Sequence, residues 1–166
     1  MASLLSIPVL GLIIIIQSAI LSRMPLVHGT TDTILVALVA WAVQVRVKNV
    51  WQWPIVGGIL VNIFSALPMG IALLGYLLTT GMVIGLRRWL WRVPLLAMIT
   101  ATILGTLLTQ SVDVIALRLG GTPIPILIAF NEIILPSALL NLSLAVPLYV
   151  LISDLAKWAY PEKIEL

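Results

Sequence analysis

The fold of this chain depends on residues 53–88, WPIVGGILVNIFSALPMGIALLGYLLTTGMVIGLRR. Two short apolar runs, residues 55–67 and 71–86, lie on either side of Pro68-Met69-Gly70. As one helix these runs would extend over about 48 Å, whereas the hydrocarbon core of a bilayer is about 30 Å thick. Proline and glycine interrupt helices, so we expect two short helices that form a glycine-rich hairpin.

The composition of the chain places this hairpin in a membrane protein. Of the 166 residues, 61% are hydrophobic and 9% are charged, and the mean hydropathy is +1.20. A typical soluble domain has about 25% charged residues. The apolar runs do not alternate with polar residues, as the strands of a membrane barrel do. We therefore predict an all-α integral membrane protein in which residues 1–166 form a single transmembrane domain.

The apolar runs predict six transmembrane helices, over residues 4–21, 33–45, 55–67, 71–86, 94–112 and 133–152. The first run lacks the features of a cleaved signal peptide, so we expect it to be retained. The second is short, and it is either extended by its flanks or buried in protein. The apolar residues 124–153 exceed one untilted span, so we divide them at Asn131-Glu132 and place residues 124–130 at the interface or in a re-entrant segment. Residues 154–166 would form a short cytoplasmic tail.

The distribution of basic residues gives the topology. Short cytoplasmic loops are enriched in lysine and arginine. With six spans, seven of the nine lysine and arginine residues lie on one face, which places both termini in the cytoplasm. A five-span arrangement, with the hairpin merged into one helix, would put Arg46 and Lys48 on the face opposite Arg87. The charge distribution therefore favours six spans.

Tryptophan and arginine flank the hairpin at both ends. Such residues lie at the level of the lipid headgroups in membrane proteins. A basic cluster with tryptophan could bind nucleic acid in a soluble protein, but here it lies between apolar spans, and we expect no nucleic-acid binding. The expected membrane-interface anchors, which would contact lipid, are Trp51, Trp53, Arg87, Arg88, Trp89, Trp91 and Arg92.

Few residues in the chain are suited to catalysis or metal binding. There is no cysteine, and His28 is the one histidine, which excludes disulfides and a zinc site with two histidines from one chain. No nucleophile or phosphate-binding motif is present. Asp113 and Glu132 could form a carboxylate pair, but we expect both to be solvated at the outer interface. The sequence therefore predicts that the protein is not an enzyme and has no cofactor or metal.

Polar residues and glycines within the spans indicate close contact between helices. Polar side chains here either hydrogen-bond between helices, which we favour, or bind a ligand; they are Gln17, Asn62, Ser65, Thr79, Thr80, Gln110 and Asn141. Glycines let helix backbones approach, as in the Gly81-x-x-x-Gly85 pattern. Either the hairpin itself packs closely or it docks a helix of another protein. The candidate docking residues are Gly57, Gly58, Asn62, Ser65, Gly70, Gly75, Gly81 and Gly85.

The order of these features resembles the MreD family of rod-shape-determining membrane proteins. Four segments carry the resemblance. Gln17-Ser18 closes the first span, and residues 29–35, GTTDTIL, resemble the Gly-x-Pro-Asp-Leu-x-Leu that precedes the second. The hairpin matches at Gly57, Gly58, Asn62, Ser65, Met69-Gly70 and Gly75-Tyr76, with Asn62 where the family has aspartate. Residues 135–141, LPSALLN, and 147–149, PLY, resemble the last span.

The resemblance implies a noncatalytic subunit of the bacterial cell-elongation complex in the cytoplasmic membrane. It implies binding to MreC, a single-span protein with a large extracytoplasmic part. Through MreC the complex would include a transpeptidase, a SEDS-type glycosyltransferase and an actin-like filament, and would support lateral peptidoglycan synthesis and cell shape. The family fold is similar to that of the substrate-binding S components of energy-coupling-factor vitamin transporters. An S component is therefore the alternative, although residues 4–21 lack its Ala-x-x-x-Ala docking pattern.

Overall fold

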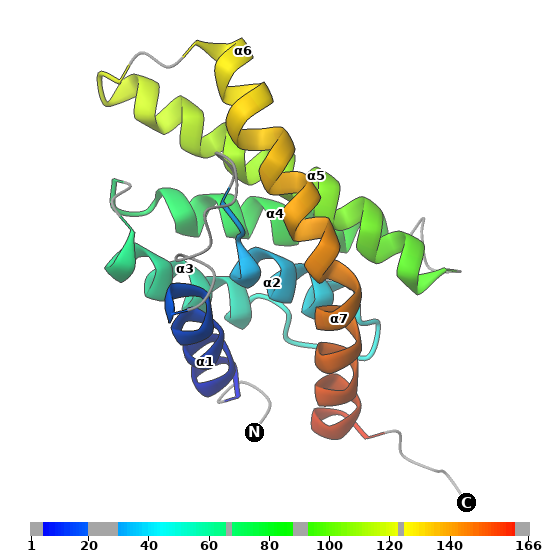
Figure 1. The fold of residues 1–166 in the computed structure, drawn as a ribbon. Coiled ribbons are helices and arrows are strands. Elements are labelled where there is room, and N and C mark those ends of the chain that lie inside the picture. The colour runs from blue at the N-terminus through cyan, green and yellow to red at the C-terminus, as the bar shows by residue number, and fades with distance from the viewer. Residues whose placement is uncertain (1–4, 20–29, 66–67, 88–92, 123–124, 162–166) are drawn as a thin grey trace, which may run out of the picture.

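The computed structural model describes residues 5–19, 30–65, 68–87, 93–122 and 125–161. These residues form helices and their connections, with no strand among them, which confirms the all-α prediction (Figure 1). The elements in chain order are α1 (Ser6–Ala19), α2 (Thr33–Val43), α3 (Gln52–Phe64), α4 (Ile71–Arg87), α5 (Pro94–Leu119), α6 (Ile126–Ile128), the π-helical segment η2 (Ala129–Ile134) and α7 (Leu135–Ala159).

Helix α2 is the centre of the bundle. All of its 11 residues are buried, and it contacts α1, α3, α4, α5 and α7. A helix that is apolar on every side is stable in a protein core or in a lipid bilayer, and here five other helices cover α2. The short second apolar run is therefore buried in protein.

The described residues of the stretch 53–88, namely 53–65 and 68–87, form the expected hairpin. Helices α3 and α4 pack against each other, and the chain turns between them at Gly70, whose φ of +94° favours glycine. A Cβ atom on Gly58 would lie 2.6 Å from the Cα atom of Leu73, so glycine is required for this close approach. Helix α3 begins and ends three residues earlier than the predicted span at residues 55–67.

Three predicted boundaries in the second half of the chain are wrong. Helix α5 continues past residue 112 to Leu119, so Asp113 and Arg118 are helical. The chain is also helical without interruption from Ile126 to Ala159, where the sequence predicted a division at Asn131-Glu132 and a last span that ends at residue 152. The π-helical segment η2 lies at the expected division, and the N–H of Leu135 bonds to the carbonyl of Phe130. This wider turn keeps the helix continuous just before Pro136, which has no N–H to donate.

The lengths of the helices differ. Helix α5 and the continuous helix Ile126–Ala159 are long and apolar enough to cross a membrane. Helices α1 to α4 are apolar but shorter. These features are compatible with a membrane protein.

The bundle has two chemically different ends. At one, the last turns of α2, α4 and α7 lie near the first residues of α3 and α5; we call it the basic end, because Arg46, Lys48, Arg87 and Lys157 follow or end these helices. At the other, the end of α1 and the beginnings of α2, α4 and α7 meet. We call this the polar end.

Candidate functional site

Asp32, at the polar end, is the centre of the candidate site. It precedes α2 as its N-cap residue, and its carboxylate accepts a hydrogen bond of 2.9 Å from the N–H of Leu35. The hydroxyl of Tyr76 on α4 donates to the same carboxylate, at 2.8 Å from Oδ2 and 3.0 Å from Oδ1. Asp32 therefore joins the start of α2 to α4.

Three side chains from other helices bind the backbone next to Asp32. Ser137 Oγ accepts from the N–H of Thr30 at 3.0 Å. Asn141 Oδ1 accepts from the N–H of Asp32 at 2.8 Å, and Gln17 Oε1 accepts from the N–H of Thr33 at 3.1 Å. The first N–H groups of a helix have no partner within it. Asn141 on α7 and Gln17 on α1 supply partners for two of them, the N–H groups of Asp32 and Thr33.

Asn141 continues the network into α5. Its Nδ2 donates to Thr106 Oγ1 at 3.0 Å, and the Thr106 hydroxyl donates to the carbonyl of Thr102 at 2.8 Å. Both Asn141 and Thr106 are 0% exposed. A buried amide is costly unless it is hydrogen-bonded. Because Asn141 is bonded through both Oδ1 and Nδ2, the orientation of its amide is fixed. We call this set the Asp32 cluster: Gln17, Asp32, Tyr76, Thr106, Ser137 and Asn141.

A second polar contact joins α4 to α5 beside this cluster. The hydroxyls of Thr79 and Thr109 lie 3.0 Å apart. Glycine makes this contact possible, because a Cβ atom on Gly105 would lie 2.7 Å from Thr79 Cγ2. A Cβ atom on Gly75 would lie 3.0 Å from Thr109 Cγ2. Small residues thus bring the two threonines together.

The chemistry of the Asp32 cluster is that of a positioning network. Burial raises the pKa of the Asp32 carboxyl, and the hydrogen bonds from Leu35 and Tyr76 oppose this effect. Asp113 on α5 is half-buried, contrary to the expected solvation, and its Oδ1 has no hydrogen-bond partner among the described residues. Glu132 is exposed. No group of three or more histidine, aspartate or glutamate residues in the described ranges could hold a metal ion.

The structure divides the candidate docking glycines into two groups. Gly57, Gly58 and Gly75 pack against other helices of the same chain, and Gly70 forms the turn. Around Gly85, in contrast, a Cβ atom would meet no described neighbour within 4 Å. At Gly81 the nearest contact would be the ring of Trp51 at 3.5 Å. Gly85 therefore remains open, whereas Gly81 lies at van der Waals distance from Trp51.

The two polar docking candidates are half-buried. Asn62 lies near the end of α3, and its Oδ1 is buried without a hydrogen-bond partner in the described part of the chain. Ser65 is the C-cap residue of α3, and its N–H bonds to the carbonyl of Val61 at 2.8 Å. Neither side chain belongs to the Asp32 cluster.

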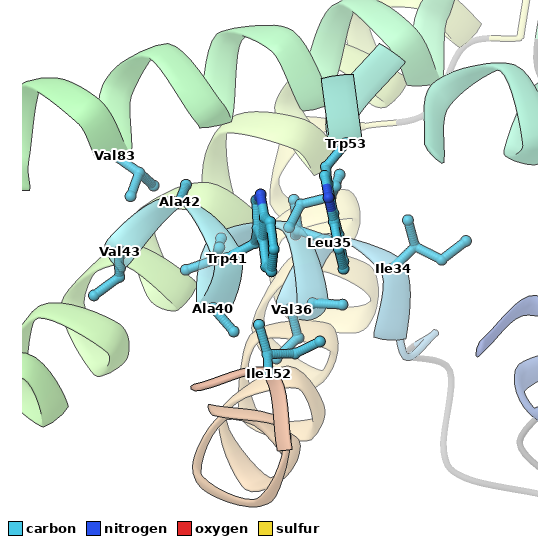
Figure 2. Packing of buried hydrophobic residues seen from close by; sticks show 14 of the residues in the cluster. Ile34, Leu35, Val36, Ala40, Trp41, Ala42, Val43, Trp53, Val83 and Ile152 are labelled. Atoms are coloured by element: carbon cyan, nitrogen blue, oxygen red, sulfur yellow. The ribbon is translucent and has the colours of Figure 1, made fainter. Parts of the chain in front are cut away.

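Among the expected interface anchors, Trp53 needs correction. It is 1% exposed, and its ring stacks on Trp41 with 4.1 Å between ring centroids (Figure 2). It is therefore a core residue. Trp51 is 49% exposed, and Arg87 hydrogen-bonds to the backbone carbonyls of Ala42 and Gln44 at the C-terminal end of α2. The anchors Arg88, Trp89, Trp91 and Arg92 lie outside the described residues.

The sequence identified only part of the Asp32 cluster. Its prediction of hydrogen bonds between helices is confirmed for Gln17, Thr79 and Asn141. Asp32 and Tyr76 were not predicted to bond with each other. An aspartate directly before an apolar run is a signal for a helix N-cap, but it does not indicate which side chains converge on it.

The chain matches no protein-family model, and no curated protein or solved structure matches it. Functional conclusions therefore depend on the residues and their geometry.

Proposed function

We propose that the protein is a multi-pass protein of the bacterial cytoplasmic membrane, with six spans and both termini in the cytoplasm. The distribution of side chains supports this proposal. Apolar residues are exposed, including Ile15 at 63% and Ile63 at 69%. Polar residues such as Thr102 are fully buried. This arrangement suits a bundle whose surface contacts lipid.

Within this membrane, we propose a noncatalytic subunit of the MreD type that supports lateral cell-wall synthesis. One observation carries the proposal. Segments that separately resemble the family, around residues 17, 30–35, 75–76 and 135–141, meet in the Asp32 cluster. Chance similarity in short segments gives no reason for them to meet. The contact between these four segments therefore supports the resemblance to the family as a whole.

The proposed partner is the transmembrane helix of an MreC-like single-span protein, which would connect this chain to a transpeptidase and a SEDS-type glycosyltransferase. Its docking face would be the outer stripe of α4, formed by Leu74, Leu78, Gly81 and Gly85. The spacing of these residues places them on one helix face. Leu74 and Leu78 are 50% and 48% exposed. Gly85 is open, and among the described residues a Cβ atom on Gly81 would meet only Trp51, at 3.5 Å. A partner helix could approach closely there.

Copurification with a tagged MreC-like protein tests this proposal. Changing Gly81 and Gly85 together to leucine should reduce recovery of the complex about tenfold, because two side chains would separate the helices. Gly11→Leu is the matched control, since a Cβ atom on Gly11 also has no described neighbour within 4 Å. An intact complex with the double variant would contradict the docking face. A stoichiometric vitamin in the purified protein would favour the S component instead.

A further inference from the structure

A small apolar cavity lies at the basic end, between the segment after α2, the last turns of α4 and the beginning of α5. Its volume is about 30 Å³. Apolar side chains from all three segments line it, among them Val45, Leu86 and Ala97, together with Arg87. A hydrocarbon chain matches such a lining better than water does, because water needs several polar partners.

Arg87 is held in place beside this cavity. Its Nη1 donates to the carbonyl of Gln44 at 3.0 Å and to that of Ala42 at 3.5 Å. Carbonyl groups at a helix C-terminus have no partner within the helix, and a cation there is favourable. No described residue accepts a hydrogen bond from Nη2 or Nε of Arg87. The guanidinium is thus fixed and retains free donors.

The surface near the cavity is also apolar. Val45 is 51% exposed, and Leu95 and Leu96 at the start of α5 are 45% and 50% exposed. These residues would extend an apolar path beyond the small cavity. The combination is a fixed cation at one end of an apolar surface.

We propose that this groove, defined by Val45, Leu86, Arg87 and Ala97, binds one anionic phospholipid. A segment of an acyl chain fills the cavity, and the lipid phosphate accepts hydrogen bonds from the free donors of Arg87. The inference depends on the proposed membrane location. Complementary charge favours an anionic lipid over a zwitterionic one, and the apolar lining favours a lipid over free phosphate.

The test uses the purified full-length protein in detergent, titrated with dioleoyl-phosphatidylglycerol or dioleoyl-phosphatidylcholine, with bound lipids counted by native mass spectrometry. We expect about a tenfold preference for phosphatidylglycerol, which Arg87→Gln abolishes. Arg87→Lys should retain most of the preference because the charge remains. Lys157→Gln is the matched control, since Lys157 is an exposed cation on α7 paired with Asp154. It should leave the preference unchanged.

A second pair of variants tests the groove without changing Arg87. Val45→Trp should fill the groove and reduce bound phosphatidylglycerol about tenfold. Val150→Trp is its control, because Val150 is 53% exposed on α7 and outside the lining. Equal lipid binding by the two tryptophan variants would overturn the inference, as would an unchanged preference in Arg87→Gln. Displacement of the lipid by inorganic phosphate would show an anion site without an acyl-chain groove.

The same variants separate this inference from the proposed function. Arg87→Gln should still copurify with the MreC-like protein, because Arg87 lines the lipid groove between α4 and α5 and does not belong to the exposed stripe of α4 proposed to dock the partner. If the wild-type protein bound both lipids equally but still copurified with the partner, only the lipid site would be overturned. Extraction of the chain from membranes by carbonate without detergent would contradict the membrane proposal itself.

Discussion

The two ends of α2 are stabilised by different interactions. At the polar end, side chains from α1, α4 and α7 hydrogen-bond to Asp32 and its neighbouring N–H groups. At the basic end, the Trp41–Trp53 stack and Arg87 replace that network. Hydrogen bonds depend strictly on direction and distance, whereas aromatic rings contribute mainly through the large apolar area that they bury. The comparison suggests that the polar end sets the position of α2 and the basic end contributes more to its burial.

The largest loss of stability is expected when a buried ring is removed at the basic end. Trp53→Ala should lower the free energy of unfolding by about 4 kcal/mol, because it leaves a cavity beside Trp41. Unfolding in dodecylmaltoside with increasing sodium dodecyl sulfate, followed by circular dichroism, measures the change. Trp51→Ala is the control, since Trp51 is 49% exposed. If the two variants lost equal stability, the stack would not be the main contact at this end.

A smaller loss is expected from the polar end. Asn141→Leu should cost about 3 kcal/mol, because the N–H of Asp32 and the hydroxyl of Thr106 lose a buried partner. The same unfolding measurement applies, and Asn131→Leu serves as the control because Asn131 is exposed. Asn141→Leu should also speed hydrogen exchange at the first turn of α2. Unchanged exchange there would show that the network does not position α2.

Tyr76→Phe removes one donor and keeps the ring. We expect a loss of about 2 kcal/mol, because the hydrogen bond to a carboxylate disappears while the N–H of Leu35 still bonds to Asp32. Tyr149→Phe on α7 is the matched control, since Tyr149 is half-buried and outside the cluster. An equal effect of both substitutions would mean that the Asp32–Tyr76 bond contributes little.

Local sequence predicted the features that depend on neighbouring residues. The beginnings of the apolar runs at residues 33 and 94 predicted the starts of α2 and α5, and Pro68-Met69-Gly70 predicted the hairpin turn. Each signal acts within a few residues. The starts of α2, α4 and α5 therefore match the predicted spans, whereas most of the other boundaries are displaced.

Other features depend on distant residues. Asp32 and Asn141 are 109 positions apart, and no local pattern pairs them. Trp53 next to basic residues is typical of an interface anchor, yet its contact with Trp41 places it in the core. The predicted span ended at residue 112, just before Asp113, but α5 continues to Leu119. Tertiary contacts decide these positions.

The smallest expected effects come from substitutions of two glycines on α4, which compare the two ends of the bundle directly. Gly75→Ala, near the polar end, should cost about 1 kcal/mol, because the new methyl group would press on Thr109, which contacts Thr79. Gly85→Ala, near the basic end, should stabilise the protein by about 0.5–1 kcal/mol, since alanine favours the helix and nothing in the described chain opposes it. Opposite signs in the unfolding measurement would show that one glycine serves the fold and the other leaves a free surface. If both substitutions destabilised the isolated protein, Gly85 would have a contact within the chain, and the partner would have to dock elsewhere.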